Sequence, residues 1–175
     1  MSGNDIAVLL GFLAAAIALA GFAGIVTSID RGAAVASNEV ISFRVGNLVT
    51  SALASVFLAL LPILLDGLET NPNRLWNRAC VVAALGIGAL VASLLLARRR
   101  MTGKDAGLSR SLFAANVTLG TTASVVLLGG VMGAVAPRGA YFVGLFYLLY
   151  LKCTLFHRMV AMADAAASHA AKKKD

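Results

Sequence analysis

One lysine lies where packing alone does not account for it. Lys152 falls inside the apolar run YFVGLFYLLYLKCTLFHRMV, six positions before Arg158, which at 1.5 Å per residue is about 9 Å from that end of the run. Ionisable side chains within a membrane-spanning segment are functional candidates. Asn47, Ser51 and Asn116 are expected at a similar depth in two other apolar runs. The four residues form the candidate polar cluster of this chain.

Two interpretations of Lys152 are open. Its long side chain could follow the outside of the helix and bring the ammonium group to the headgroups, as lysines near helix ends do. Alternatively, it could face the other helices and donate hydrogen bonds to the side-chain carbonyls of Asn47 and Asn116. That arrangement would make a cationic pocket open to the cytoplasm.

The remaining chemistry-bearing residues exclude several classes of protein. Asp30 and Asp66 stand at the ends of apolar runs and Glu69 lies outside them, whereas proton- and cation-coupled carriers need an intramembrane carboxylate. The two cysteines have no CxxC spacing and no paired histidine, so we expect no metal and no other cofactor. No nucleophile stands beside a base, so we expect no enzyme activity.

The composition defines the elements that must position these residues. Hydrophobic residues make up 59% of the 175 and charged residues 13%, against roughly half and a quarter in soluble domains. The apolar residues form long blocks, which favours transmembrane helices of about 20 residues over a β-barrel. We predict an all-α bundle of five transmembrane helices. Their ranges are 6–29, 43–65, 79–97, 112–135 and 139–159.

The break between the last two helices depends on Pro137. A proline cannot continue a helix without losing a hydrogen bond, so the apolar block from 112 to 161 is interpreted as a tight hairpin. The alternative is four spans, with the last block outside the membrane. That alternative would expose a long aromatic and leucine-rich surface.

The positive charges predict the orientation, because segments rich in lysine and arginine resist translocation. With five spans, 11 such residues fall on one side and three on the other, Lys152 being left out. The N-terminus is therefore expected outside and the C-terminus in the cytoplasm, with residues 1–162 as the membrane domain and 163–175 as a basic cytoplasmic tail. The larger group comprises Arg31, Arg44, Arg98, Arg99, Arg100, Lys104, Arg110, Arg158 and Lys172 to Lys174; the smaller comprises Arg74, Arg78 and Arg138.

Small residues recur at helical spacing in three of the predicted spans. In the first they are Gly11, Ala14, Ala18 and Gly21. Helices in lipid associate where small residues let their backbones approach, so each such stripe is a predicted interface. The other two stripes are Ala79, Ala83, Gly86, Ser93 and Ala97, and Asn116, Gly120, Ala123, Gly130 and Ala134.

The segments FRVGNLVTSALASVFLALLPILL and YFVGLFYLLYLKCTLFHRM, with the three arginines after the third span, together resemble a broad set of small multi-spanning proteins of the bacterial inner membrane that have no assigned activity. The resemblance covers most of the chain and rests on residue texture. It implies a multi-pass protein of the bacterial inner (plasma) membrane. It carries no catalytic residues to transfer.

These observations lead to one expected function and one alternative. We expect a non-enzymatic accessory or structural component that associates through its small-residue faces with itself or with a larger membrane complex. Its basic residues, Arg98, Arg99, Arg100 and Arg158 among them, are expected to contact anionic lipid headgroups and not nucleic acid. The alternative is a small carrier or channel for an anionic or neutral solute that uses the candidate polar cluster.

Overall fold

In a computed structural model, which describes residues 1–30, 38–100 and 110–172, the described residues form α-helices joined by short turns. These residues form five helices, each long and apolar enough to cross a membrane, which confirms the predicted number of helices. That all five cross the membrane stays a prediction. The helices are α1 (Gly3–Asp30), α2 (Asn38–Asp66), α3 (Pro72–Arg100), α4 (Arg110–Val131) and α5 (Pro137–Lys172).

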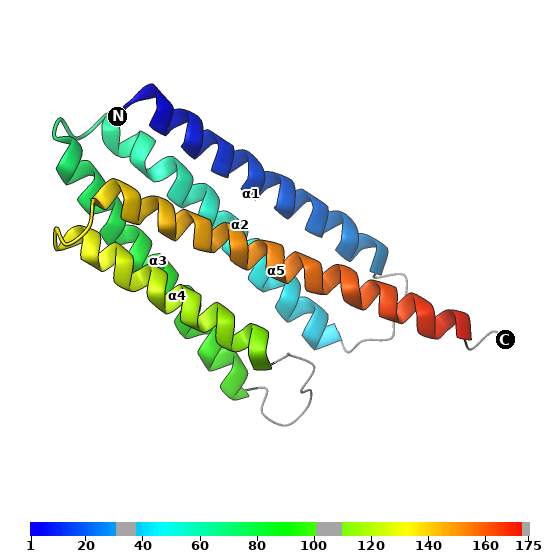
Figure 1. Ribbon diagram of the computed structural model, residues 1–175. Helices are drawn as coiled ribbons and strands as arrows, with labels where there is room; N and C mark the ends of the chain where they lie inside the picture. Colours follow the sequence, from blue (N-terminus) through cyan, green and yellow to red (C-terminus); the bar gives the residue numbers. More distant parts are fainter. Residues whose placement is uncertain (31–37, 101–109, 173–175) are drawn as a thin grey trace.

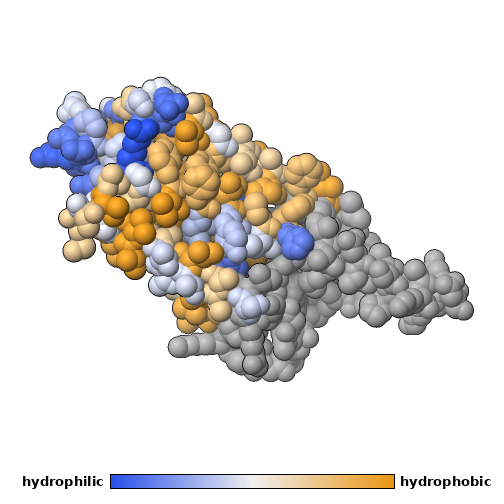
Figure 2. All heavy atoms as spheres, in the orientation of Figure 1, coloured by the Kyte–Doolittle hydropathy of each residue, from blue (hydrophilic) through white to orange (hydrophobic). Residues whose placement is uncertain are grey.

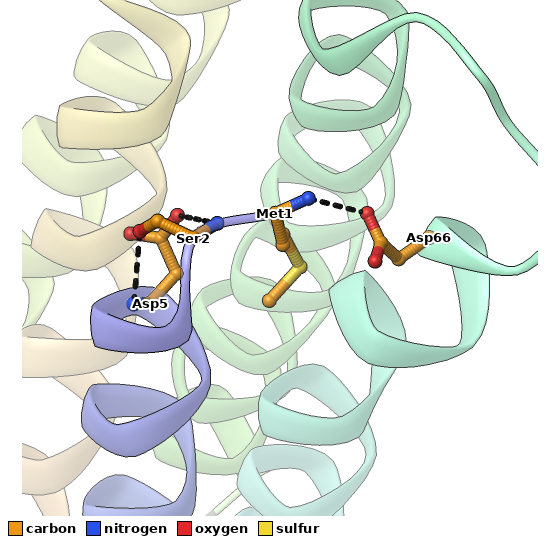
Figure 3. A network of polar contacts seen from close by, with 4 residues as sticks. All are labelled: Met1, Ser2, Asp5 and Asp66. Carbon is orange, nitrogen blue, oxygen red and sulfur yellow. Dashed lines mark hydrogen bonds and ion pairs between the residues drawn. The ribbon is translucent and has the colours of Figure 1, made fainter.

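The first and third helices begin with side-chain caps. Ser2 and Asp5 exchange hydrogen bonds, the Asp5 amide donating to the Ser2 hydroxyl and the Ser2 amide to the Asp5 carboxylate, which is a capping box (Figure 3). At α3, the amide of Asn73 donates to the side-chain oxygen of Asn71 at 3.0 Å. Pro72 opens the helix at the position where a missing N–H costs nothing.

The fourth helix ends at Val131, four residues before the predicted end at Val135. Gly133 has a φ of 77° and its amide donates to the Gly130 carbonyl, while the amide of Ala134 donates to Gly129. This is a Schellman motif, which ends a helix with a residue in the left-handed region. The apolar residues after Gly133 therefore belong to the hairpin before Pro137.

The helices lie side by side in one bundle with the start of α1 and the end of α5 at opposite ends (Figure 1). The last helix, α5, is the central one, because it contacts each of the other four. Its hydroxyl groups tie it to its neighbours: Tyr141 donates to the carbonyl of Leu58 on α2, and Tyr147 to that of Asn116 on α4 at 3.3 Å. A polar residue on the inner face of α5 is therefore enclosed by helices.

The surface has the pattern expected of helices in a bilayer. Figure 2 shows hydrophilic residues gathered at the end that carries the N-terminus and a broad hydrophobic surface along the helices beyond it. Large side chains exposed on the outside of the bundle include Ile17, Phe57, Leu85, Val125 and Phe146. Exposed apolar surface on this scale is typical of a protein that faces lipid.

Candidate functional site

Lys152 lies on the inner side of α5 and is 1% exposed. A lysine that followed the outside of the helix to the headgroups would be exposed in the bundle. The burial therefore favours the interpretation in which Lys152 faces the other helices. Its neighbour Cys153 points outward and carries a free thiol.

Asn116 is 8% exposed on α4. Its backbone carbonyl accepts the hydrogen bond from Tyr147, but its side-chain oxygen Oδ1 has no hydrogen-bond partner among the described residues. The ammonium nitrogen Nζ of Lys152 has none there either. The predicted hydrogen bond between these two side chains is therefore not formed, although both side chains are buried.

The third and fourth members of the cluster come from α2. Ser51 is 1% exposed, and its backbone carbonyl accepts a hydrogen bond from the Ser55 hydroxyl at 3.0 Å. Asn47 lies one turn earlier on the same helix. The side chain of Asn47 lies outside the described part of the structure, so its place in the cluster stays a prediction.

The contacts between helices determine which of these residues share a level. A Cβ built on Gly144 of α5 would lie 3.1 Å from Leu127 of α4, and the two helices are antiparallel. Lys152 follows Gly144 by eight residues. Because the helices are antiparallel, Lys152 lies at the level of the residue eight positions before Leu127, which is Leu119. Leu119 is within one turn of Asn116.

The same reasoning applies to α2. Tyr141 of α5 bonds to Leu58 of α2, and these helices are also antiparallel (Figure 1). Counting 11 residues along each helix from this contact brings Lys152 level with Asn47, one turn from Ser51. The fold thus brings the polar residues of α2, α4 and α5 to one level of the bundle.

The predicted small-residue stripes have different surroundings. On α4, Gly120, Ala123 and Gly130 face the bundle, and a Cβ on Gly120 would lie 2.5 Å from the Tyr147 hydroxyl oxygen. On α3, Ala79 and Ala83 are buried while Ser93 is exposed. These stripes serve the packing of the bundle itself along much of their length.

The stripe on α1 faces outward. Gly11, Ala14, Ala18 and Gly21 are all exposed, and so is Ala7 before them. A Cβ on Gly11 or Gly21 would meet nothing within 4 Å. The buried residues of α1, among them Leu9 and Ala16, lie on the opposite face. This stripe of small residues is therefore on the outer surface of the helix.

Charges at the N-terminal end of the bundle are paired, which the sequence analysis did not anticipate. The N-terminal ammonium lies 2.8 Å from Asp66 (Figure 3), Arg78 lies 2.7 Å from Glu69, and Arg138 pairs with Asp5. Asp5 is 3% exposed. The Ser-x-x-Asp pattern before the first apolar run was the available signal for the cap at Asp5, whereas its pairing with Arg138 depends on the fold.

The predicted headgroup contacts lie at the opposite end. Arg98, Arg99 and Arg100 form the last turn of α3, and Arg158 lies within α5. Their side chains lie outside the described part of the structure, so lipid contact stays a prediction. Among the described residues, no group of three or more histidine, cysteine, aspartate or glutamate side chains is placed to hold a metal ion.

Comparisons of the chain with known protein families, with curated proteins and with solved structures find no match.

Proposed function

We propose that this chain is a multi-pass protein of the bacterial inner membrane, with its N-terminus outside and its C-terminus in the cytoplasm. The five apolar helices support this proposal, and so does the position of the start of α1 and the end of α5 at opposite ends of the bundle. The distribution of charge supports the proposed orientation, in which the C-terminal end of the bundle faces the cytoplasm. Arg78 and Arg138 at the N-terminal end are paired with acids, whereas the tract of three arginines stands at the other end.

Within the membrane, we propose that the protein is a non-enzymatic accessory or structural component that associates through α1. The observation that carries this proposal is the outward stripe of Gly11, Ala14, Ala18 and Gly21. Large side chains exposed on other helices include Leu53, Leu85 and Phe146. A stripe of small residues offers lipid little contact area, but it lets a second helix approach closely.

The spacing of the stripe favours one packing geometry. Positions 7, 11, 14, 18 and 21 alternate in steps of four and three, which is the a and d pattern of a left-handed helix pair. Two copies of α1 related by a two-fold axis would bring the same small residues together. A homodimer is thus the simplest assembly, and a larger membrane complex would use the same face.

Association is tested with two neighbouring substitutions on α1. Ala18→Phe places a ring on the stripe, and Ile17→Phe places one about 100° around the same helix, also at an exposed position. Both proteins should fold, because neither position is buried. In mild detergent and in bilayers, chemical cross-linking should yield dimers for wild type and for Ile17→Phe, and much less for Ala18→Phe. A wild-type protein that stays monomeric in bilayers would contradict the proposal.

We further propose that the arginines at the cytoplasmic end bind anionic lipids, with Arg98, Arg99, Arg100 and Arg158 as the headgroup contacts. Each basic residue near an anionic surface contributes about 1 kcal/mol. Replacing phosphatidylglycerol by phosphatidylcholine should lower the unfolding temperature of wild type. The same exchange of lipids should lower the unfolding temperature less in a variant in which the three consecutive arginines are replaced by glutamine. An equal decrease in wild type and variant would argue against headgroup contacts by these arginines.

A further inference from the structure

The second helix contains a proline near its C-terminal end. Pro62 lies within α2, which ends at Asp66, and its side chain is fully buried. In a regular α-helix the amide of residue 62 would donate to the carbonyl of residue 58. Proline has no N–H, so the carbonyl of Leu58 lacks its helical donor. A backbone carbonyl without a donor is costly in the interior of a membrane, where water does not replace the lost hydrogen bond.

The missing donor comes from the central helix. The hydroxyl of Tyr141 on α5 donates to the carbonyl of Leu58, in a buried hydrogen bond. Tyr141 is 1% exposed and Leu58 is 3% exposed, so water has little access to either group. The acceptor of this bond is the same carbonyl that loses its helical donor at Pro62. Tyr141 therefore supplies the hydrogen bond that the proline removes from α2.

Tyr141 is also held by a third helix. Its ring packs against that of Trp76 on α3, with the two ring centroids 5.7 Å apart, and Trp76 is 5% exposed. Close packing of this kind confines a side chain to one rotamer. The contact with Trp76 thus helps to keep the Tyr141 hydroxyl directed at the Leu58 carbonyl, and α2, α3 and α5 are joined at this tyrosine.

We propose that Pro62 and Tyr141 form a latched hinge in α2. Prolines interrupt the hydrogen bonds of a helix and are common sites of bending. The residues after Pro62, 63–66, are therefore an end segment that can turn about the proline. The Tyr141 hydroxyl is the latch, because it satisfies the Leu58 carbonyl while α2 lies against α5. Without this hydroxyl, the carbonyl has to turn toward water at the near end of the bundle, and α2 bends at Pro62.

The end segment carries a contact with the first helix. Asp66, the last residue of α2, lies 2.8 Å from the N-terminal ammonium group (Figure 3). A turn of the end segment about Pro62 therefore shifts the start of α1 as well. The latch connects α5 to α1 through α2. It does not depend on the proposed association through α1, because its hydrogen bond lies inside a single bundle.

Unfolding of the full-length protein in mixed detergent tests whether Tyr141 replaces the missing amide. Tyr141→Phe leaves the Leu58 carbonyl without a donor and should lower the folding equilibrium constant roughly tenfold to a hundredfold. Pro62→Ala restores the amide, so in that background Tyr141→Phe should lower the constant by a factor at least about threefold smaller. If Tyr141→Phe alone does not fold, adding Pro62→Ala should restore folding. An equal loss in both backgrounds, or a failure of this rescue, would overturn the proposal.

The matched control is Tyr147→Phe. Tyr147 also lies on α5 and donates to a buried backbone carbonyl, that of Asn116 on α4, at 3.3 Å. The residue four positions after Asn116 is Gly120, whose amide remains as a helical donor when the hydroxyl is removed. Tyr147→Phe should therefore lower the folding equilibrium constant by the same factor with and without Pro62→Ala. A dependence on Pro62 as strong as that of Tyr141→Phe would contradict a specific latch.

Distances between spin labels in nanodiscs test the motion itself. With both native cysteines replaced by serine, one pair of labels joins Leu64→Cys in the end segment to Val125→Cys on α4. The control pair joins Leu53→Cys, before Pro62, to the same position on α4, and all three positions are exposed. Adding Tyr141→Phe should shift or broaden the distances of the first pair and leave those of the control pair unchanged. Unchanged distances in both pairs, or equal changes in both, would overturn the hinge.

Discussion

The buried carboxylate of Asp5 has two functions at the N-terminal end of the bundle. It accepts a hydrogen bond from the Ser2 amide and so starts α1, and it pairs with Arg138 at the start of α5. Because Asp5 is almost fully enclosed, its carboxylate has exchanged most of its contact with water for contact with these partners. The first turn of α1 is thereby held against the first turn of the central helix.

Removing Arg138 should therefore destabilise the protein. In Arg138→Ala the Asp5 carboxylate keeps its cap but loses its counter-charge, and we expect a loss of roughly 1–3 kcal/mol in the free energy of unfolding. Arg74→Ala, at an exposed arginine of the same end, should cost less than about 0.5 kcal/mol. Unfolding in mixed detergent measures both variants. Equal stabilities would mean that the ion pair contributes nothing measurable.

Gly133 permits a second prediction at the scale of one residue. Its φ of 77° is in the region that residues with a Cβ avoid, although a Cβ there would meet nothing within 4 Å. Gly133→Ala should cost about 1 kcal/mol through the backbone alone. Gly139→Ala is the matched control, since Gly139 is also open and lies in the first turn of α5. The same unfolding measurement compares the stabilities of the two variants. A larger loss of stability in Gly139→Ala than in Gly133→Ala would contradict the role given to the positive φ of Gly133.

At the scale of helices, the small residues of α4 and α1 have different surroundings, although the two stripes are similar in sequence. The small residues of α4 let α3 and α5 approach, so that a Cβ on Gly120 would lie 2.6 Å from Val91 as well as 2.5 Å from Tyr147. The small residues of α1 have no such neighbours. The same sequence signal thus marks an interface inside the bundle in one helix and an outward face in the other.

Alanine substitutions should separate these two cases. Gly120→Ala overpacks the contact between α3, α4 and α5, and we expect it to cost roughly 1–3 kcal/mol. Gly11→Ala should leave stability unchanged or slightly raised, since it adds a good helix former in open space. The free energies of unfolding of the two variants, measured in detergent, test this difference. The interpretation fails if Gly11→Ala is the more destabilising of the two.

A double substitution tests whether Tyr147 is the neighbour that matters. Tyr147→Phe removes the hydroxyl oxygen nearest to the added Cβ, together with its hydrogen bond to Asn116. In the background of Tyr147→Phe, Gly120→Ala should therefore cost less than it does alone, by about 0.5 kcal/mol or more. Additive effects would place the clash at Val91 instead.

At the scale of the whole molecule, an odd number of helices separates the two ends of the chain. The bundle has a hydrophilic end with paired charges and an opposite end where α3 finishes in three arginines. If the protein is inserted as proposed, these two ends face different compartments. The cluster of Lys152, Asn116 and Ser51 is then nearer to the cytoplasmic side, because the span of α5 finishes at His157.

Labelling of single cysteines in intact cells tests this arrangement. In a background in which Cys80 and Cys153 are serine, a membrane-impermeant maleimide should label Asn71→Cys, between α2 and α3, after outer-membrane permeabilisation. It should label Ser168→Cys only after lysis of the inner membrane. Labelling of both positions before lysis would contradict the odd number of crossings.

The sequence by itself determined the helical class, the number of long apolar helices and the shared level of the polar residues along them. These properties depend on the length and hydrophobicity of continuous segments, and on local signals such as Pro137 and the Asn-Pro-Asn turn at Asn71. Even the end of α4 was open to local reasoning, because Gly133 lies four residues before Pro137. The predicted end of this helix, at residue 135, lay too far along the chain, because hydropathy alone does not show that a glycine adopts a positive φ and ends the helix.

Only the tertiary structure decided which way each helix faces. The alanine-rich helices have apolar residues on all sides, so their sequences carry no strong signal for an inner face. The structure makes the last helix the central one, which encloses Lys152, and it turns the stripe of Gly11, Ala14, Ala18 and Gly21 outward. Facing is set by packing among helices that are distant in sequence, and this is why a lysine on α5 and an asparagine on α4 can each be buried.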